Sequence, residues 1–194
     1  MESPIDLRTL DLQLHTPLTG DVMTNVLPCN LPIFQYSFPQ VITKKTCKQY
    51  RKSFPQSNLS NVHAWHSDYL THEKTDVFDP LIKIVIDTCN TISKDVFKSP
   101  IGLPYHYSVD NLWLAMYEHN DYTMKHDHFP SVFSACYYVD VKDKCSPIIF
   151  GENDELSIQP ENGMLLVWLG MIPHKVMPTK KKRTCICMNV IVSR

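Results

Sequence analysis

The sequence predicts a mainly β protein, a sandwich or barrel of short strands with helical support on one side. From about residue 107, short apolar segments rich in aromatic and β-branched residues alternate with turn signals, which is typical of sandwiches and barrels. One long amphipathic helical pattern precedes them. A chain of 194 residues suits one domain, so we expect a single domain over residues 1–194.

The strongest strand pattern is the nearly continuous apolar run "GMLLVWLG", which follows the turn signal "PENG". In the first third of the chain, Leu10, Leu12 and Leu14 alternate with a period of two through "DLQLHT", and "PIFQYSF" is a second extended piece. The other predicted strands are "NLWLAMYE", "SVFSACYYVDV", "SPIIFGE", "ELSIQP" and "RTCICMNVIV".

Residues 76–98, "DVFDPLIKIVIDTCNTISKDVFK", form the best helical pattern, in which Asp79 can cap the helix and Pro80 can take its first position. The apolar stripe predicts packing on the outer face of a sheet, and "TKKTCKQYRKS" is a shorter basic helix. We therefore expect a support region over 1–104 and a β core over 105–194. The stripe consists of Leu81, Ile82, Val85, Thr88, Cys89 and Ile92.

The net charge of −1 gives no support for nucleic acid as a partner, and the run Lys180, Lys181, Lys182 is interpreted as a solvated turn. No apolar run has the length of a membrane span, and the N-terminus has no signal-peptide pattern, so we expect no membrane partner. The seven cysteines include no CxxC pair, which favours reduced thiols. A cytoplasmic location is expected, in the host if the chain is viral; the oligomeric state is not indicated.

The segment "YTMKHDHFPS" places two histidines either side of an aspartate. Side chains two apart on a strand point the same way, so His126 and His128 could bind one metal ion while Asp127 points away. The third ligand would be His174 in "GMIPHKV", which follows an apolar strand and a turn. The alternative is a polar bend without a metal.

The segment "RTCICMNVIV" has one apolar face and one mixed face. The mixed face carries Arg183, Cys185, Cys187 and Asn189, which predicts core on one side and a ligand pocket on the other. A buried arginine needs a compensating anion, and a carboxylate held by two hydrogen bonds is the natural one. The alternative is an exposed arginine beside the lysines.

Taken together, "LWLAMYEHNDYTMKHDHFPSVFSACYYVDV" and "QPENGMLLVWLGMIPHKVMPTKKKRTCICMNVIV" give the order of an aromatic strand, HxH, an apolar strand, His and Arg. This order resembles the iron(II)/2-oxoglutarate-dependent oxygenases of phages and bacteria. The similarity covers roughly residues 55–192 and includes the upstream stretch "SNVHAWHSDYL"; its strongest part is 111–190.

The resemblance implies a double-stranded β-helix, a jelly-roll or cupin-like core, with Fe(II), 2-oxoglutarate as cosubstrate and dioxygen as reactants. The implied activity is an oxidoreductase, a hydroxylase that couples oxidative decarboxylation of 2-oxoglutarate to oxidation of a small molecule or protein side chain. Most of that family ligates iron with His-x-Asp/Glu and a later His. Here His128 replaces the carboxylate, so the implied ligands are His126, His128 and His174, with Asp127 as the alternative ligand if the segment is irregular.

The resemblance further implies that Arg183 binds the far carboxylate of 2-oxoglutarate. Cys185 stands where a serine often adds a hydrogen bond, and Tyr117, Tyr138 or Tyr137 could assist. Asn189 shares the face of Arg183 and could line the pocket. No catalytic residue is expected beyond the metal site.

Three other functions remain open from the sequence. A cupin-type metal dioxygenase would not use 2-oxoglutarate, but the glutamate that cupins carry after HxH is missing from "FPSVFSACYY". A non-catalytic metal-binding β-barrel module is compatible with the missing carboxylate. A hydrolytic zinc site is chemically possible, but no general base is evident.

Overall fold

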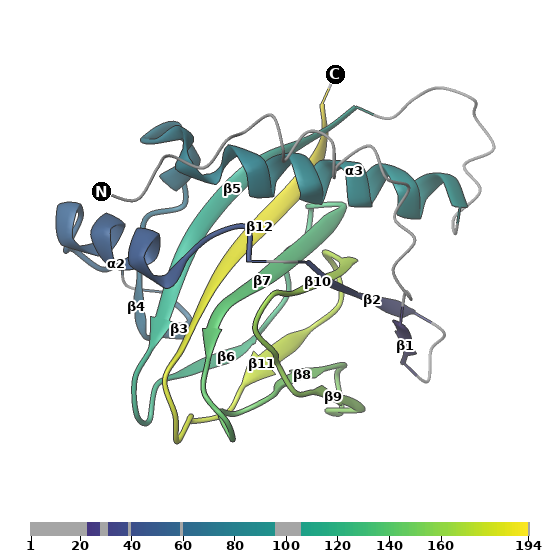
Figure 1. Cartoon of the computed structure of the whole chain (residues 1–194). Coiled ribbons are helices and arrows are strands. Elements are labelled where there is room, and N and C mark those ends of the chain that lie inside the picture. The colour runs from purple at the N-terminus through teal and green to yellow at the C-terminus, as the bar shows by residue number, and fades with distance from the viewer. Residues whose placement is uncertain (1–22, 28–30, 39, 59, 96–105, 194) are drawn as a thin grey trace.

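Two antiparallel sheets form the framework of this computed structural model, which describes residues 23–27, 31–38, 40–58, 60–95 and 106–193. One sheet has seven strands and the other has five, and they lie face to face (Figure 1). The larger sheet has the order β1 (Met23–Val26), β2 (Pro32–Ser37), β10 (Met164–Leu169), β7 (Phe133–Val141), β12 (Arg183–Ser193), β5 (His106–Tyr117), β4 (Trp65–His66). The smaller sheet has the order β3 (Val62–His63), β6 (Tyr122–His126), β11 (His174–Val176), β8 (Ile148–Phe150), β9 (Leu156–Ile158).

β10 shows why its sequence is apolar at nearly every position. The strand lies inside the larger sheet between β2 and β7, and both of its faces are covered. Leu165 and Val167 belong to a core on the helical side, whereas Leu166 and Trp168 belong to a core between the two sheets. Alternation across a strand buried on both faces gives a continuous apolar run.

β12 has the two faces that its sequence predicts. Ile186, Met188 and Val190 are buried in the helix-side core. Arg183 and Cys185 point the other way and line a cavity between the sheets. β12 pairs with β5 along its whole length and with β7 along most of it. Arg183 and Cys185 therefore reach the cavity from an inner strand of the larger sheet.

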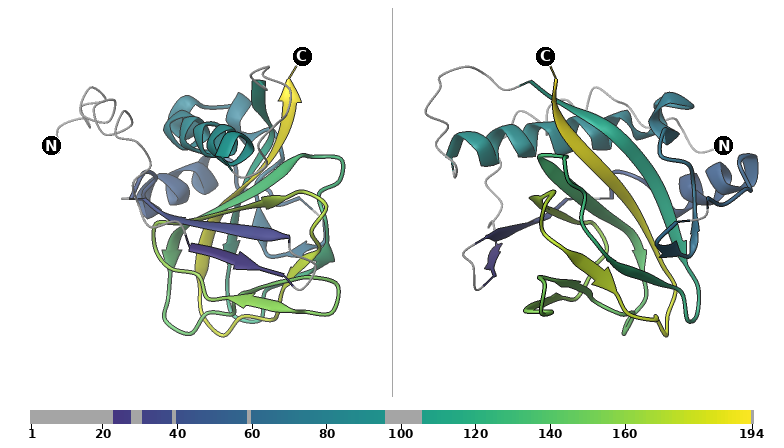
Figure 2. Two further views of the ribbon diagram at one scale, coloured as in Figure 1. Left: turned by 90° about the vertical axis from the view of Figure 1, so that its right-hand side faces the viewer. Right: turned by 180° about the vertical axis from the view of Figure 1, so that it is seen from behind.

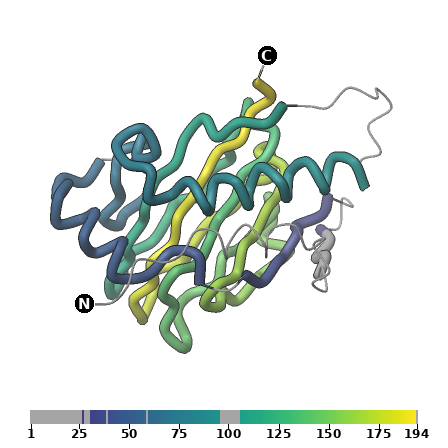
Figure 3. Tube along the Cα trace, turned by 45° about the horizontal axis from the view of Figure 1, so that its top comes forward, coloured from purple at the N-terminus to yellow at the C-terminus, as the bar shows by residue number. Residues whose placement is uncertain are grey.

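The long helix α3 (Asp79–Asp95) lies across the outer face of the larger sheet, as expected (Figures 2 and 3). A 3-10 turn, η2 (Asp76–Phe78), leads directly into it. Its stripe differs from the prediction at one position, because Ile84 is buried whereas Ile82 is only half-buried. The basic helix α2 (Lys44–Ser53) is also confirmed.

Thr43 precedes α2 and accepts a hydrogen bond from the Thr46 N–H (3.1 Å), which caps the first turn of the helix. A second 3-10 turn, η1 (Thr71–Glu73), precedes η2. Within the described residues, no helix has both the length and the hydropathy needed to cross a membrane.

One expectation needs correction. The short strands β6 and β11 are not among the predicted strands, and β6 ends at His126, so, contrary to expectation, His128 does not share a strand with His126. His66, in the stretch "SNVHAWHSDYL", is fully buried, with Nε2 2.8 Å from Ser60 Oγ. The alternating leucines of "DLQLHT" lie outside the described residues.

Candidate metal centre

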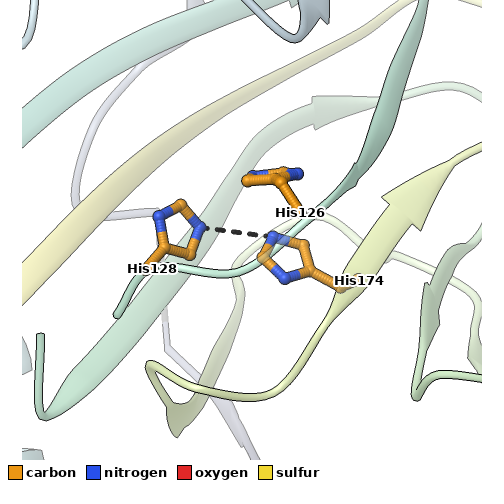
Figure 4. Close-up of side chains that lie close together, drawn as sticks. All are labelled: His126, His128 and His174. Atoms are coloured by element: carbon orange, nitrogen blue, oxygen red, sulfur yellow. Dashed lines mark hydrogen bonds between the residues drawn. The ribbon is translucent and has the colours of Figure 1, made fainter. Parts of the chain in front are cut away.

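Three imidazoles meet at the facing surface of the smaller sheet (Figure 4). His126 ends β6, and His174 begins β11 as its direct cross-strand partner, which brings the ring centroids to 4.4 Å. His128 lies in the turn after β6, where its N–H donates to the Gly170 carbonyl (2.7 Å). Its ring centroid is 4.8 Å from that of His126 and 5.0 Å from that of His174.

In two of the three rings, a hydrogen bond to the main chain determines which nitrogen is free to bind a metal. The Nδ1 atom of His126 is 2.8 Å from the Met124 carbonyl, and the Nδ1 atom of His174 is 3.3 Å from the Ile172 carbonyl. A carbonyl only accepts, so each Nδ1 carries the proton and each Nε2 presents its lone pair. This is the usual second interaction of a metal-bound histidine.

The spacing of the nitrogens fits one metal ion. The Nε2 atoms of His128 and His174 are 3.3 Å apart, and one ligand atom from each of the three rings lies within 4.8 Å of the others. With metal–nitrogen bonds of about 2.1 Å, two ligands at right angles are about 3 Å apart. The three rings could therefore occupy one face of an octahedral ion after small movements.

Burial keeps the three rings uncharged. It lowers the pKa of His128 to about 3, with a further contribution from His126. The pKa of His174 lies well below its ordinary value, again chiefly through burial, and that of His126 is also lowered. A metal ion needs neutral imidazoles, so the site does not have to lose protons to bind one near neutral pH.

Asp127 is not brought into this group. Its side chain is exposed, and Oδ1 accepts a hydrogen bond from the Phe129 N–H (3.0 Å). The cluster holds no carboxylate from the described residues. The structure thus assembles the three-histidine set and not the alternative ligand.

Arg183 lies deep in the same cavity, only 2% exposed. Its guanidinium lies over the Tyr117 ring (4.3 Å from the centroid), and one terminal nitrogen donates to the Ser146 carbonyl (3.1 Å). Its Nε is buried without a hydrogen-bond partner, and no carboxylate of the described residues pairs with it. A buried cation left in this state is costly unless an anion joins it.

Of the remaining predicted residues, three line one of two cavities, and Tyr137 and Tyr138 line neither. Tyr117 and Cys185 line the inner cavity, where the Tyr117 hydroxyl shares a hydrogen bond with Thr123 Oγ1 (2.6 Å). The Tyr138 hydroxyl is buried without a partner, 5.7 Å separating its ring centroid from the guanidinium carbon of Arg183. Asn189 lines an outer cavity instead, and Tyr137 lies on the helical side, accepting from the Val41 N–H (3.0 Å).

The two cavities differ in size. The inner one has a free volume of about 30 Å³, whereas the outer one has about 450 Å³, and His126 and His128 line both. The inner space holds an ion or a water molecule but not a dicarboxylate, so side chains must move to admit one.

Sequence reasoning missed the aromatic wall around the histidines. The Trp168 ring meets the His174 ring edge to face at 4.9 Å, and the Trp113 ring lies 5.7 Å from the His128 ring. Both tryptophans occupy inward positions of apolar strands, which was the available signal, but only the assembled sheets show which strand face meets the histidines. Both tryptophan rings are buried, so this side of the site is apolar.

No protein-family model and no curated protein sequence matches this chain. Solved structures do, and they have the double-stranded β-helix of 2-oxoglutarate-dependent iron oxygenases, so the predicted fold is confirmed. A prolyl-4-hydroxylase of Pseudomonas putida superposes with a TM-score of 0.63 at 15% identity, over 86% of this chain and 95% of that chain.

Two further structures have the same fold. The α-ketoglutarate-dependent epimerase SnoN of nogalamycin biosynthesis has a TM-score of 0.58 at 12% identity, over 82% of this chain and 77% of its own. The collagen prolyl hydroxylase of Paramecium Bursaria Chlorella virus-1, in a 2-oxoglutarate complex, has a TM-score of 0.55 at 11% identity, over 80% and 94%. At these identities the likeness establishes the fold.

Proposed function

We propose that this protein is an Fe(II)/2-oxoglutarate-dependent dioxygenase that hydroxylates a substrate still to be identified. The observation that carries the proposal is Arg183, a buried cation with an unpartnered Nε in the cavity that also contains the three histidines. Such an arrangement suits a ligand that is anionic at one end and chelates a metal at the other. The names of the solved structures with this fold point to the same chemistry.

Each residue has a defined role in this proposal. His126, His128 and His174 hold Fe(II), which together with 2-oxoglutarate and dioxygen supplies the oxidising chemistry. Arg183 binds the far carboxylate of 2-oxoglutarate, and the Tyr138 hydroxyl, which has no partner, donates a further hydrogen bond. Burial of these groups strengthens both interactions, because few water molecules compete.

The outer cavity is the natural place for the substrate. Its lining includes Trp113, Asn111 and Asn189, and its rim carries Phe129, which is 78% exposed. An amide pair beside an aromatic wall suits a polar group, on a small molecule or on a protein side chain. The similar structures include a prolyl-4-hydroxylase and an epimerase of nogalamycin biosynthesis, so they give examples of both kinds of substrate.

The first test is anaerobic. Fe(II) and then 2-oxoglutarate are added to the metal-free protein, and the weak visible charge-transfer band of the iron chelate is recorded. We expect a band in the wild type, loss of the band in Arg183→Ala with iron still bound, and retention in Arg51→Ala. Arg51 is a matched control because it is also an arginine stacked on an aromatic ring. It belongs to α2, lies over the ring of Trp65 on β4, and does not line the cavity.

Each outcome separates the candidate functions. Iron binding without a band would contradict 2-oxoglutarate chelation and favour a cupin-type site. Failure to bind iron would contradict the metal centre. A band in the wild type would justify screening of substrates by release of succinate.

A further inference from the structure

Three thiols form a second cluster in the inner cavity. Cys136 on β7 and Cys187 on β12 are direct cross-strand partners, and their sulfur atoms are 3.9 Å apart. Cys185, two residues before Cys187 on the same strand face, places its sulfur 4.0 Å from that of Cys187. All three sulfurs lie within 4.8 Å of one another and line the cavity that contains Arg183.

These distances match the geometry of a metal ion bound by three thiolates. With metal–sulfur bonds of about 2.3 Å, sulfur atoms lie about 4.0 Å apart in a trigonal plane and about 3.8 Å apart in a tetrahedron. Two of the three separations, 3.9 and 4.0 Å, already lie in this range, and the third is within 4.8 Å. The free volume of about 30 Å³ admits an ion without the movement that a dicarboxylate requires.

The charge in the cavity also suits thiolates. Three thiolates and a divalent ion carry one net negative charge, which the guanidinium of Arg183 can balance. Hydrogen bonds from Cys136 and Cys187, with the charge of Arg183, hold the pKa of the Cys185 thiol well below its ordinary value. Burial raises the pKa of the Cys136 thiol well above its ordinary value, and hydrogen bonds with Cys136 and Cys185 do the same for Cys187, so a bound ion would have to displace the protons of these two thiols.

We propose that Cys136, Cys185 and Cys187 form a binding site for a thiophilic d¹⁰ cation such as Zn²⁺, distinct from the three-histidine centre. Binding forms three metal–sulfur bonds and releases the protons of those thiols that are not already ionised. Because the ion and the far carboxylate of 2-oxoglutarate would use the same guanidinium, we infer that they exclude each other. This second statement rests on the proposed function, whereas the metal site does not.

Co²⁺ is the probe for the thiol site, because thiolate ligands give an intense near-ultraviolet charge-transfer band that imidazole ligands do not. The reduced, metal-free full chain is titrated with Co²⁺, and Zn²⁺ is then added to displace it. We expect the band in the wild type, in His174→Ala, and in Cys89→Ala, a control thiol buried in α3. We expect its loss in Cys187→Ala and in Cys136→Ala.

Circular dichroism identifies any variant that fails to fold, and the second cysteine variant then replaces it. A wild-type protein without the band, or a band that survives in both folded cysteine variants, would overturn the metal site.

A second titration, with excess 2-oxoglutarate present, tests whether the ion and 2-oxoglutarate exclude each other. We expect a several-fold weaker apparent affinity of the thiols for Co²⁺. An unchanged affinity, in protein that forms the iron–2-oxoglutarate band, would overturn exclusion alone.

Discussion

At residue 128 an imidazole occupies the position where the resemblance places a carboxylate, and this one side chain sets the net charge of the centre. Three neutral imidazoles leave the full charge of a divalent ion on the metal, and Arg183 adds another positive charge in the same cavity. A doubly charged anion such as 2-oxoglutarate would offset most of it. Retention of a buried arginine beside a neutral ligand set is therefore consistent with an anionic cosubstrate.

We expect His128→Asp to retain iron. The substitution restores two histidines and one carboxylate, a ligand set that binds Fe(II) in many oxygenases, and leaves the cross-strand pair His126 and His174 intact. The measurement is the iron content of the protein after anaerobic loading and desalting. His174→Ala serves as the control that removes a ligand, and we expect it to lose iron. Absence of iron from His128→Asp would mean that the site requires three imidazoles.

The elements with a strong apolar pattern could be predicted, and those without it could not. α3 and β12 are long, so their patterns of 3.6 and 2 residues accumulate enough positions to be recognised. β6 (YTMKH) and β11 (HKV) are short and rich in histidine and lysine, so they lack the run of apolar residues that marks the short β8, and pairing between β6 and β11 defines both strands. The HxH spacing predicted from sequence that His126 and His128 lie together, although His128 reaches the cluster from a turn.

The contact between α3 and the sheet can be tested by a pair of substitutions one residue apart. Leu81 is fully buried against the larger sheet, whereas Ile82 is half-buried. We expect Leu81→Ala to lower the free energy of unfolding by about 2–5 kcal/mol, because it leaves a cavity, and Ile82→Ala to lower it by less. Urea denaturation measures both. Equal losses would contradict the orientation of the helix.

Across the whole molecule, the larger sheet separates two cores. The helix-side core includes Leu114 and Ile186. The core between the sheets surrounds His174, Arg183 and a group of thiols, which cost stability when they lack partners. The sequence predicts that β12 has a polar face. That this face meets the histidines follows only from the packing of the smaller sheet against the larger one.

This buried polar content predicts how the stability of the molecule depends on pH. His66 is fully buried, and burial holds its pKa below the ordinary value of 6.5 despite the hydrogen bond to the Ser67 carbonyl. Below pH 6.5 the unfolded chain therefore takes up a proton that folded His66 does not, so the contribution of His66 to stability is present above that pH and is lost as the pH falls. In the metal-free protein, the three site histidines act with the same sign.

We expect the free energy of unfolding of metal-free protein to fall between about pH 7 and about pH 5. The fall should be smaller in His66→Gln, which cannot take up the proton. Urea denaturation at several pH values measures the slope for each protein. A slope in His66→Gln equal to that of the wild type would show that His66 is protonated as readily in the folded chain as in the unfolded one.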